Sequence, residues 1–402
     1  MAYKEFLDET LSTVQEEDLQ IVIPYFFEDR KKEIIKKEEN QDLVFIDKNY
    51  NLGANYKDLI TTNVKALSFF SGCGGFDIGT HLAGVEVISA MDFDASCVRT
   101  LNSNKIFENA FISHENINNV KGGTYDKVIK DNKAEKLIII GGPPCQPFSK
   151  AGYWKGNDAR LGFDDPRNMI GEYLRIINDI RPDGFILENV ESILHPSNKI
   201  AVEFIIENIN QLGYDYRVVK ANAIDYGVPQ KRKRLFFVAS KNKFKTNEPQ
   251  KTHGINGNMS FESVINWIGK FDIPKYAENA ESAEGKYFED LIQVPNGKNY
   301  IALTARNNYV NPKFVAGKRY WTFLLKLEPA LPSWTIIAQP GHWEGPFHWT
   351  NRRLRVPEIA AIQTFPEDFV LYGSPRVAHK QIGNAVPPLL GKAIVKFLIE
   401  NL

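Results

Sequence analysis

From about residue 64 onward, hydrophobic positions alternate between short continuous runs and patterns with helical spacing. Residues 170–180 and 202–212 each place their apolar side chains on one face of a helix. The short runs predict strands at Val64–Phe70, Val85–Met91, Leu137–Ile140, Phe185–Leu187 and Leu235–Val238. Strands that alternate with helices are typical of a mostly parallel sheet covered by helices on both faces, so we expect an α/β fold.

Two flanking regions break this pattern. Residues 1–60 carry 8 Lys and Arg against 14 Asp and Glu, a net charge of −6, and their apolar positions have helical spacing. We therefore expect an acidic, mostly helical N-terminal appendage, followed by an α/β domain over 61–240. Residues 241–348 are rich in Asn, Gly, Lys and aromatic residues, which indicates a smaller, loop-rich domain. Residues 349–402 return to helical spacing, with an apolar helix around Leu389–Leu398.

Composition narrows the class of protein. The 402 residues have zero net charge, so the part outside the appendage is mildly basic, which permits a polyanionic partner without requiring one. No window of ~18 uncharged apolar residues is present, and the N-terminus lacks the apolar core of a signal peptide. Three cysteines, at 73, 97 and 145, are too few for a disulfide framework or a Cys-rich metal site. We expect a soluble, cytosolic protein with no membrane span and no metal.

The first candidate site is the glycine-rich segment Phe69–Gly79, which follows a predicted strand. Its glycines let the backbone approach a ligand closely. Twenty residues after Gly72, Asp92 ends the next strand, where a carboxylate can accept both ribose hydroxyls of a nucleoside, and Phe93 beside it can cover an adenine ring. Because position 77 is Asp, the glycine spacing favours a nucleoside cofactor such as S-adenosylmethionine over a dinucleotide.

Two further segments follow predicted strands. Cys145 lies in Gly141–Ser149, directly after the strand Leu137–Ile140, in a loop that two prolines stiffen. Glu188 comes directly after the strand Phe185–Leu187. Because the carboxyl ends of parallel strands meet at one edge of a sheet, this thiol and this carboxylate can serve there as nucleophile and acid.

The basic run Gln230–Arg234 precedes the strand Leu235–Val238. Alternate residues of a strand share a face, so we expect Arg232 and Arg234 to point together and to hold a phosphate or a base oxygen. Taken alone, a basic run of this kind is more often part of a solvated surface. Cys73 and Cys97, in the same way, are each more often a small buried residue than a reactive thiol.

In this order, the segments resemble the cytosine-5 DNA methyltransferases over roughly 64–402. Six segments match that family's motifs: Phe69–Gly79, Pro143–Gln146, Glu188–Val190, Gln230–Arg234, Arg352–Pro366 and Gln381–Val386. The resemblance implies a Rossmann-like, S-adenosylmethionine-dependent methyltransferase domain. It also implies that 241–348 form an inserted target-recognition domain and that the C-terminal segment 349–402 returns to the catalytic domain over 61–240.

The resemblance also implies roles for individual residues. Cys145 would attack carbon 6 of a flipped-out cytosine, Glu188 would bind ring nitrogen 3, and Arg234, with Arg232, would complete the catalytic set. DNA contacts would come from Gln146, Ser149, Gln230 and Arg232. The cofactor pocket would be formed by Phe70, Ser71, Gly72, Gly75, Asp92, Phe93, Asn116, Ile117, Gly142, Pro144, Ile170, Asn384 and Val386. Asn116 stands where the family usually has Asp.

The implied reaction moves a methyl group to carbon 5 of cytosine in a short target and leaves S-adenosylhomocysteine. The partner would be double-stranded DNA bound by a monomer and, by analogy with compact family members, a cognate restriction endonuclease. Eight basic residues of 241–348 would supply phosphate contacts: Lys241, Lys243, Lys245, Lys251, Arg306, Lys313, Lys318 and Arg319. The aromatic residues Trp343, Phe347, His348 and Trp349 either pack the hinge between the domains or contact bases.

Two alternative functions stay open. A subgroup with this architecture methylates transfer RNA and carries a Cys-Phe-Thr tripeptide in the recognition region, whereas this chain has no cysteine after 145. A non-catalytic DNA-binding regulator on the same fold would be expected to lose Cys145 or Glu188, and both are present. The acidic appendage is either a helical strap on the catalytic domain or a docking site for another protein.

Overall fold

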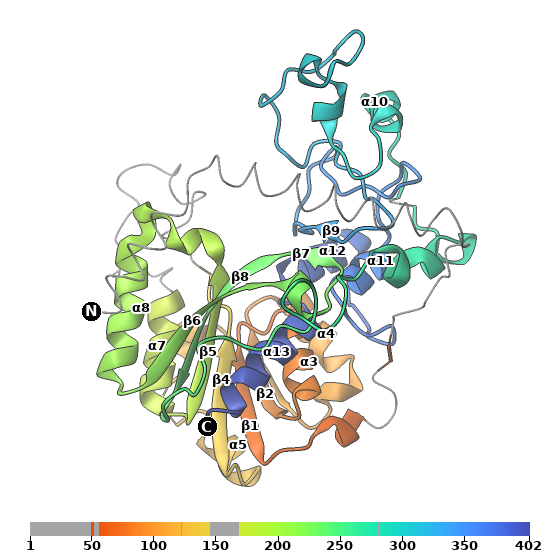
Figure 1. Ribbon diagram of the computed structural model, residues 1–402. Helices are drawn as coiled ribbons and strands as arrows, with labels where there is room; N and C mark the ends of the chain where they lie inside the picture. The colour runs from red at the N-terminus through yellow and green to blue at the C-terminus, as the bar shows by residue number, and fades with distance from the viewer. Residues whose placement is uncertain (1–49, 52–55, 122, 145–168, 280) are drawn as a thin grey trace.

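A computed structural model describes residues 50–51, 56–121, 123–144, 169–279 and 281–402. A large lobe built on a sheet carries a smaller, irregular lobe that contains α10 (Phe288–Gln293) (Figure 1). Of the predicted site residues, Cys145, Gln146 and Ser149 lie outside the described residues, as does most of the predicted appendage.

In the described part of the chain, seven strands form the main sheet in the order β3-β2-β1-β4-β5-β8-β6. Their bounds are β1 (Val64–Phe69), β2 (Glu86–Asp92), β3 (Phe111–His114), β4 (Lys136–Gly141), β5 (Gly184–Val190), β6 (Asp215–Asn222) and β8 (Lys233–Ser240). Neighbours from β3 to β5 pair in parallel, whereas β8 runs antiparallel to both β5 and β6. The predicted mostly parallel α/β sheet is confirmed, with β3 and β6 as additions.

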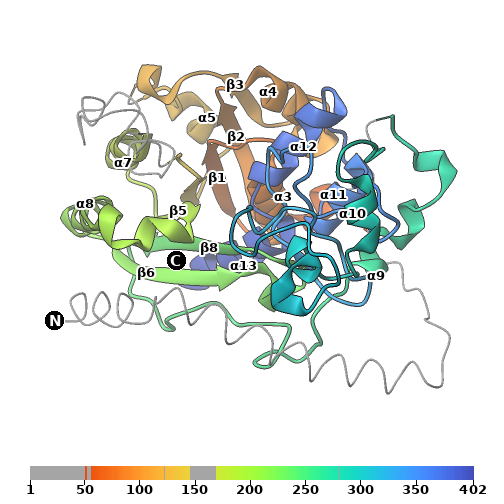
Figure 2. The ribbon, with the colours of Figure 1, turned by 90° about the horizontal axis from the view of Figure 1, so that it is seen from above.

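Helices cover both faces of this sheet, as Figure 2 shows with α7 and α8 on one side and α3 and α13 on the other. The helices of the large lobe are α3 (Gly75–Leu82), α4 (Ala95–Asn102), α5 (Asp126–Asp131), α7 (Met169–Ile180), α8 (Lys199–Gln211), α9 (Ile265–Ile268), α11 (Val356–Ile362), α12 (Pro375–Asn384) and α13 (Pro388–Ile399). The apolar faces predicted over 170–180 and 202–212 are the buried faces of α7 and α8.

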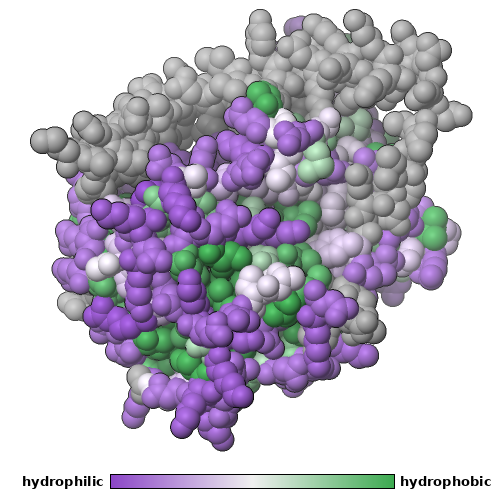
Figure 3. Space-filling view, turned by 60° about the horizontal axis from the view of Figure 1, so that its bottom comes forward, coloured by the Kyte–Doolittle hydropathy of each residue, from purple (hydrophilic) through white to green (hydrophobic). Residues whose placement is uncertain are grey.

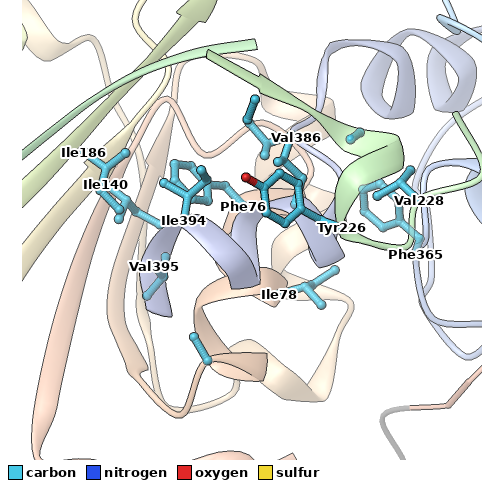
Figure 4. Packing of buried hydrophobic residues seen from close by; sticks show 14 of the residues in the cluster. Phe76, Ile78, Ile140, Ile186, Tyr226, Val228, Phe365, Val386, Ile394 and Val395 are labelled. Carbon is cyan, nitrogen blue, oxygen red and sulfur yellow. The ribbon is translucent and has the colours of Figure 1, made fainter. Parts of the chain in front are cut away.

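The two faces of the sheet form separate hydrophobic cores because successive side chains of a strand point to opposite sides. In β4, Ile138 and Ile140 pack in one core, whereas Leu137 and Ile139 pack in the other. The first core receives α3 and α13, and Figure 4 shows side chains of these helices, among them Phe76 and Ile394, close to side chains of the sheet. Burial of aliphatic side chains on both faces explains why the central strands read as continuous apolar runs.

The small lobe has a core of its own, formed by Ala283, Leu291, Val294, Tyr300, Leu303, Phe323, Leu324 and Phe347. Aromatic rings dominate it: Tyr300 and Phe323 meet edge to face with ring centroids 5.8 Å apart. Edge-to-face contacts of this kind suit a lobe with little regular structure, because large rings supply buried area without a sheet. The earlier part of the predicted second domain, including Trp267 and Phe271, packs in the core of the large lobe instead.

One stretch of the described chain, Pro375–Ile399, combines helical structure with high mean hydropathy. It is long and apolar enough to cross a membrane by length and composition, although most of its apolar window is buried inside the fold. Ile382, Ile394 and Leu398 belong to the core of the large lobe, so α12 and α13 are core helices.

On the face turned forward in Figure 3, hydrophobic residues gather near the centre within a hydrophilic surround.

Candidate active site

The glycine-rich turn after β1 forms one wall of the site. Phe70 (φ +56°), Gly72 (φ +56°) and Gly74 (φ +89°) all adopt left-handed backbone conformations, which is unusual for a residue such as Phe70. A Cβ on Gly72 would meet open space, whereas a Cβ on Gly75 would come within 2.4 Å of the carbonyl oxygen of Val386. Gly75 therefore allows α3 to approach the C-terminal segment that forms the facing wall.

Asp92 ends β2 beside this turn. Its Oδ2 accepts from the backbone N–H of Gly72 at 2.7 Å, and its Oδ1 accepts from the N–H of Asp94 at 2.8 Å. Burial raises the pKa of the Asp92 carboxyl, and these backbone donors oppose that rise. Each carboxylate oxygen has further acceptor capacity, so Asp92 can still accept ribose hydroxyls. The ring of Phe93 is 72% exposed, which leaves it open to stack on a base.

Glu188 lies on β5 rather than after it, and it pairs with Arg234 on β8. Its Oε1 is 2.9 Å from Nε of Arg234. Burial raises the pKa of the Glu188 carboxyl, and the cations of Arg234 and Arg232 partly oppose the rise. A Cβ on Gly142 would come within 2.9 Å of Oε2 of Glu188, so the glycine makes room for this carboxyl.

The next residue connects this strand to the loop that leads to Cys145. Nδ2 of Asn189, which is buried, donates to the carbonyl oxygen of Pro143 at 3.3 Å. Pro143 and Pro144 are the last residues before the part of this loop that lies outside the described residues. The strand that carries Glu188 therefore also fixes the start of the segment that carries the candidate nucleophile.

These walls enclose a cavity of about 810 Å³ at the carboxyl ends of the parallel strands. This is the position where chain order in the sheet reverses, between β1 and β4, and where open α/β sheets bind ligands. The cavity is lined by most of the predicted cofactor residues, namely Phe70, Ser71, Gly72, Asp92, Phe93, Asn116, Ile117, Gly142, Pro144, Asn384 and Val386, and also by Glu188.

Two predicted cofactor residues do not line the cavity. Ile170 is buried in the core between the sheet and α7, and the preceding residue, Met169, faces the cavity in its place. Met169 and Ile170 are one residue apart and therefore point in directions about 100° apart around the helix. Apolar spacing alone does not show which of the two faces the cavity. Gly75 contributes through its contact with Val386, as described above.

Gln230 and Arg232 require a larger correction. Both side chains are 0% exposed, so neither is positioned in this structure for the DNA contact that the basic run predicted. The guanidinium of Arg232 donates to the carbonyl oxygens of Ile336, Gly383 and Ala385 at 3.1, 2.8 and 3.0 Å. The amide of Gln230 bonds Gln363 and the backbone N–H of Ile336. These two residues hold the site together from within.

The cavity also has residues that sequence reasoning missed. Nζ of Lys380, on α12, is 3.0 Å from Oδ2 of Asp94, and its positive charge faces the Asp92 region. Cys97 lines the cavity as well, but it is buried and its thiol pKa is raised, which agrees with its interpretation as a small structural residue. In the sequence, the position of Asp94 two residues after Asp92 was the feature that could have indicated a local cluster of charges here.

The comparison with known families decides the identity. Residues 64–400 match the family model described as C-5 cytosine-specific DNA methylase. The chain belongs to this family and is a cytosine-5 DNA methyltransferase. Among similar proteins, the type II methyltransferase M.SacI of Streptomyces achromogenes is 34% identical over 367 residues, 84% of this chain and 93% of the relative. M.NgoFVII of Neisseria gonorrhoeae is 32% identical, covering 84% and 88%.

Solved structures agree on the fold of this methylase. A mutant of Spodoptera frugiperda DNMT2 superposes with a TM-score of 0.59 at 17% identity, covering 83% of this chain and 99% of the other. The Entamoeba histolytica methyltransferase EhMeth gives a TM-score of 0.55 at 16% identity, covering 85% and 99%. At such identities the similarity concerns the fold alone.

The aromatic residues just before the segment Arg352–Pro366 of the methylase pack in its interior. Phe347 and His348 are 1% and 0% exposed, Phe347 in the core of the small lobe, and Trp349 packs against the core of the large lobe. Of the two readings of this cluster, packing at the junction of the lobes is therefore the one that fits the structure.

Proposed function

We propose that the chain transfers a methyl group from S-adenosylmethionine to carbon 5 of a flipped-out cytosine in a short DNA target, through a covalent bond to Cys145. The observation that carries the proposal is the Glu188–Arg234 pair, held at the same cavity as the glycine-rich turn. A base in front of this pair and a methyl donor in the cavity would meet at one sheet edge.

The described residues fit an adenosine-containing cofactor. The cavity offers the open ring of Phe93 for an adenine, the carboxylate of Asp92 for ribose hydroxyls and the space in front of Gly72 for close approach. Asn116 and Ile117, also at the cavity, would bind the adenine edge, and Asn384 would close the opposite side. When bound, S-adenosylmethionine supplies an electrophilic methyl group.

Glu188 and Arg234 would then prepare the cytosine. Because burial raises the pKa of Glu188, its protonated form is favoured relative to an exposed glutamate, and this form can donate a hydrogen bond to ring nitrogen 3. Arg234 would bind the oxygen at position 2. Both contacts withdraw electron density from the ring, which makes carbon 6 more open to attack.

Cys145 would act as the nucleophile. Its thiolate forms a bond to carbon 6, and the electron pair of the 5,6 double bond becomes available at carbon 5, which takes the methyl group. Carbon 5 then loses its proton, and the bond between carbon 6 and sulfur breaks to restore the ring. Because a paired base cannot reach this site, the cytosine must leave the duplex first.

The proposed substrate is double-stranded DNA, and one chain would act as a monomer in the bacterial cytoplasm, where the DNA is. The similarity to type II methyltransferases supports a role beside a restriction endonuclease. Transfer RNA is the alternative substrate, and the fold shared with DNMT2 is neutral between the two because fold does not fix substrate.

The test measures transfer of labelled methyl from S-adenosylmethionine to unmethylated DNA and, in parallel, to bulk transfer RNA. Cys145→Ser and Glu188→Gln serve as variants. We expect label on DNA as 5-methylcytosine, none with Cys145→Ser and a roughly 10²- to 10⁴-fold lower rate with Glu188→Gln. Label on RNA alone would replace the proposal with the alternative, and label on neither, with the cofactor bound, would indicate a regulator.

A further inference from the structure

A tryptophan–lysine cluster lies where the small lobe joins the large one. The rings of Trp321 and Trp334 meet edge to face with centroids 5.5 Å apart, and Nζ of Lys231 lies 4.3 Å from the centroid of the Trp334 ring. Trp321 is 51% exposed. We refer to Lys231, Trp321 and Trp334 as the Trp–Lys cluster.

The backbone holds this cluster rigidly. β7 (Gln230–Lys231) and β9 (Ser333–Trp334) pair in parallel with Lys231 opposite Trp334, so these two side chains share one face of the small sheet. On the other face Gln230 and Ser333 are buried against the large lobe. Further bonds join Thr335 Oγ1 to the Lys231 carbonyl at 2.6 Å and Ser333 N–H to the Pro229 carbonyl at 2.8 Å.

Trp321 is fixed from the small lobe. Nδ2 of Asn299, which is buried, donates to the carbonyl oxygen of Trp321 at 2.8 Å. The ring is therefore presented by a tied backbone and braced on one edge by Trp334. A rigid, half-exposed tryptophan has lost the conformational freedom that would otherwise oppose binding, so a partner ring can stack on it at low entropic cost.

The cluster is close to the reacting groups. Arg234, whose Nε contacts Glu188, comes three positions after Lys231, and three extended residues span at most about 11 Å. Figure 1 shows β7 and β9 where the large lobe meets the small one. DNA held between Glu188 and the small lobe would therefore pass beside Trp321.

Packing does not account for the exposed half of Trp321. Another tryptophan of the small lobe, Trp343, has its ring against Tyr287 at 5.7 Å and packs on the lobe's core. An exposed tryptophan beside a lysine offers a π-face for a base and a cation for a phosphate. Burial lowers the pKa of Lys231 to about 7, so a phosphate nearby would favour its charged form.

We infer that the Trp–Lys cluster binds one nucleotide of the target DNA next to the flipped cytosine, with its base stacked on Trp321 and its phosphate facing Lys231. The inference rests on the proposed function, because it requires a duplex that the enzyme distorts at its target. When the cytosine has left the duplex, the neighbouring base can unstack, and an unstacked base is the kind of group that an exposed tryptophan beside a lysine binds.

The test begins with the full chain and a plasmid. The cytosines that it methylates are mapped by bisulfite sequencing, and a duplex of that sequence is made with 5-iodouracil at single positions around the target. We expect irradiation of the complex with S-adenosylhomocysteine to crosslink one neighbouring position to Trp321. In parallel, Trp321→Ala should weaken duplex binding roughly 5- to 150-fold, and Trp321→Phe, which keeps a ring, much less.

Controls separate stacking from general damage. Phe111→Ala, a ring of similar exposure (48%) on the distant strand β3, should leave binding unchanged. Lys231→Met should reduce the salt dependence of binding by about one phosphate contact, whereas Trp321→Ala should leave that slope as it is. S-adenosylhomocysteine binding by each variant reports that the fold is intact.

The outcomes are distinct. Crosslinking at Trp321 together with the selective loss in Trp321→Ala supports the inference. A wild-type chain that methylates the plasmid while Trp321→Ala binds within twofold of it, or crosslinks that map elsewhere, would overturn the inference and leave the proposed function standing. A wild-type chain that neither methylates nor binds duplex DNA would overturn both.

Discussion

Arg232 donates to the carbonyl oxygen of Gly383 at 2.8 Å across 151 residues of sequence. The same guanidinium reaches Ile336, just after β9, and Ala385, at the cavity wall. One buried cation therefore joins the segment that returns from the small lobe to the segment that closes the cofactor cavity. Arg232 also partly opposes the rise that burial causes in the pKa of Glu188, so its charge acts on the carboxyl that is proposed to bind the base.

Arg232→Met should destabilise the protein by about 3–5 kcal/mol, because buried carbonyls would lose charge-assisted donors. Lys233→Met, at the exposed neighbouring position, should change the free energy of unfolding by less than about 0.5 kcal/mol. Urea unfolding measures both. An unchanged midpoint and slope for Arg232→Met would show that the carbonyls find other partners at no cost.

The pH dependence of methyl transfer should report on Glu188. If the protonated carboxyl binds the base, single-turnover rates should fall as the pH rises through its raised pKa, because the carboxylate can no longer donate. Arg234→Met removes a cation that lowers this pKa, so the falling limb should move to higher pH. Glu188→Gln, which keeps a donor at every pH, should lose the limb, and a persisting limb in that variant would assign it to another group.

Asp77 on α3 should make stability depend on pH. It is 0% exposed, and neither carboxylate oxygen has a hydrogen-bond partner among the described residues. Burial raises the pKa of its carboxyl to about 7. The folded state therefore binds a proton more tightly than the unfolded state, and this contribution to stability is lost as the pH rises from about 4 to about 7.

Asp77→Asn removes the charge at nearly constant shape. The free energy of unfolding of the variant relative to wild type should grow by about 2–3 kcal/mol between pH 5 and pH 7. His81 has its pKa lowered to about 3 by burial and has the opposite pH dependence, but it is present in both proteins and cancels in the difference. Parallel stability curves for the two proteins would contradict the assignment.

Tyr50 attaches the end of the predicted appendage to the large lobe. Its hydroxyl donates to the carbonyl oxygen of Thr364 at 2.8 Å, its own carbonyl accepts from the N–H of Glu367 at 2.9 Å, and its ring packs against the core. A boundary at residue 60 would remove this anchor. We expect a chain that starts at 61 to be less stable than one that starts at 50.

Tyr50→Ala should therefore lower the free energy of unfolding by about 2–4 kcal/mol, and Tyr50→Phe, which loses the hydroxyl bond alone, by about 1 kcal/mol. Thermal unfolding of the full chain measures both. If Tyr50→Ala melts with wild type, the anchor contributes nothing and a start at 61 is harmless.

The helices, strands and turns that could be predicted are those whose pattern lies in neighbouring residues of the sequence. The central strands were predicted because both faces are buried, and the turn at Gly72 because its glycines follow a strand. Strand β6 was missed because most of its residues, such as Val218, are only partly buried and give no continuous apolar run. Glu188 was placed after β5, although the strand continues through it, because polar residues interrupt the pattern.

The predictions that were wrong depended on distant partners. A basic run reads as a DNA-binding surface until the carbonyls of Gly383 and Ala385 are known to surround Arg232. The exposure of Trp321 also depends on distant residues, because Asn299 and Trp334 hold its ring in the folded state. The sequence gives the identity of these residues, but it does not show which distant residues surround them in the folded protein.

The cavity has walls from both ends of the described chain, since Phe70 and Gly72 face it from one end and Asn384 and Val386 from the other. On the ribosome these walls are made more than 300 residues apart, so a growing chain has the glycine-rich turn long before it has the segment that closes over it. Tight cofactor binding must therefore wait for the last stretch of translation. A partly synthesised or prematurely terminated chain would leave the host's DNA unmodified, and the cell obtains activity only from chains that are finished.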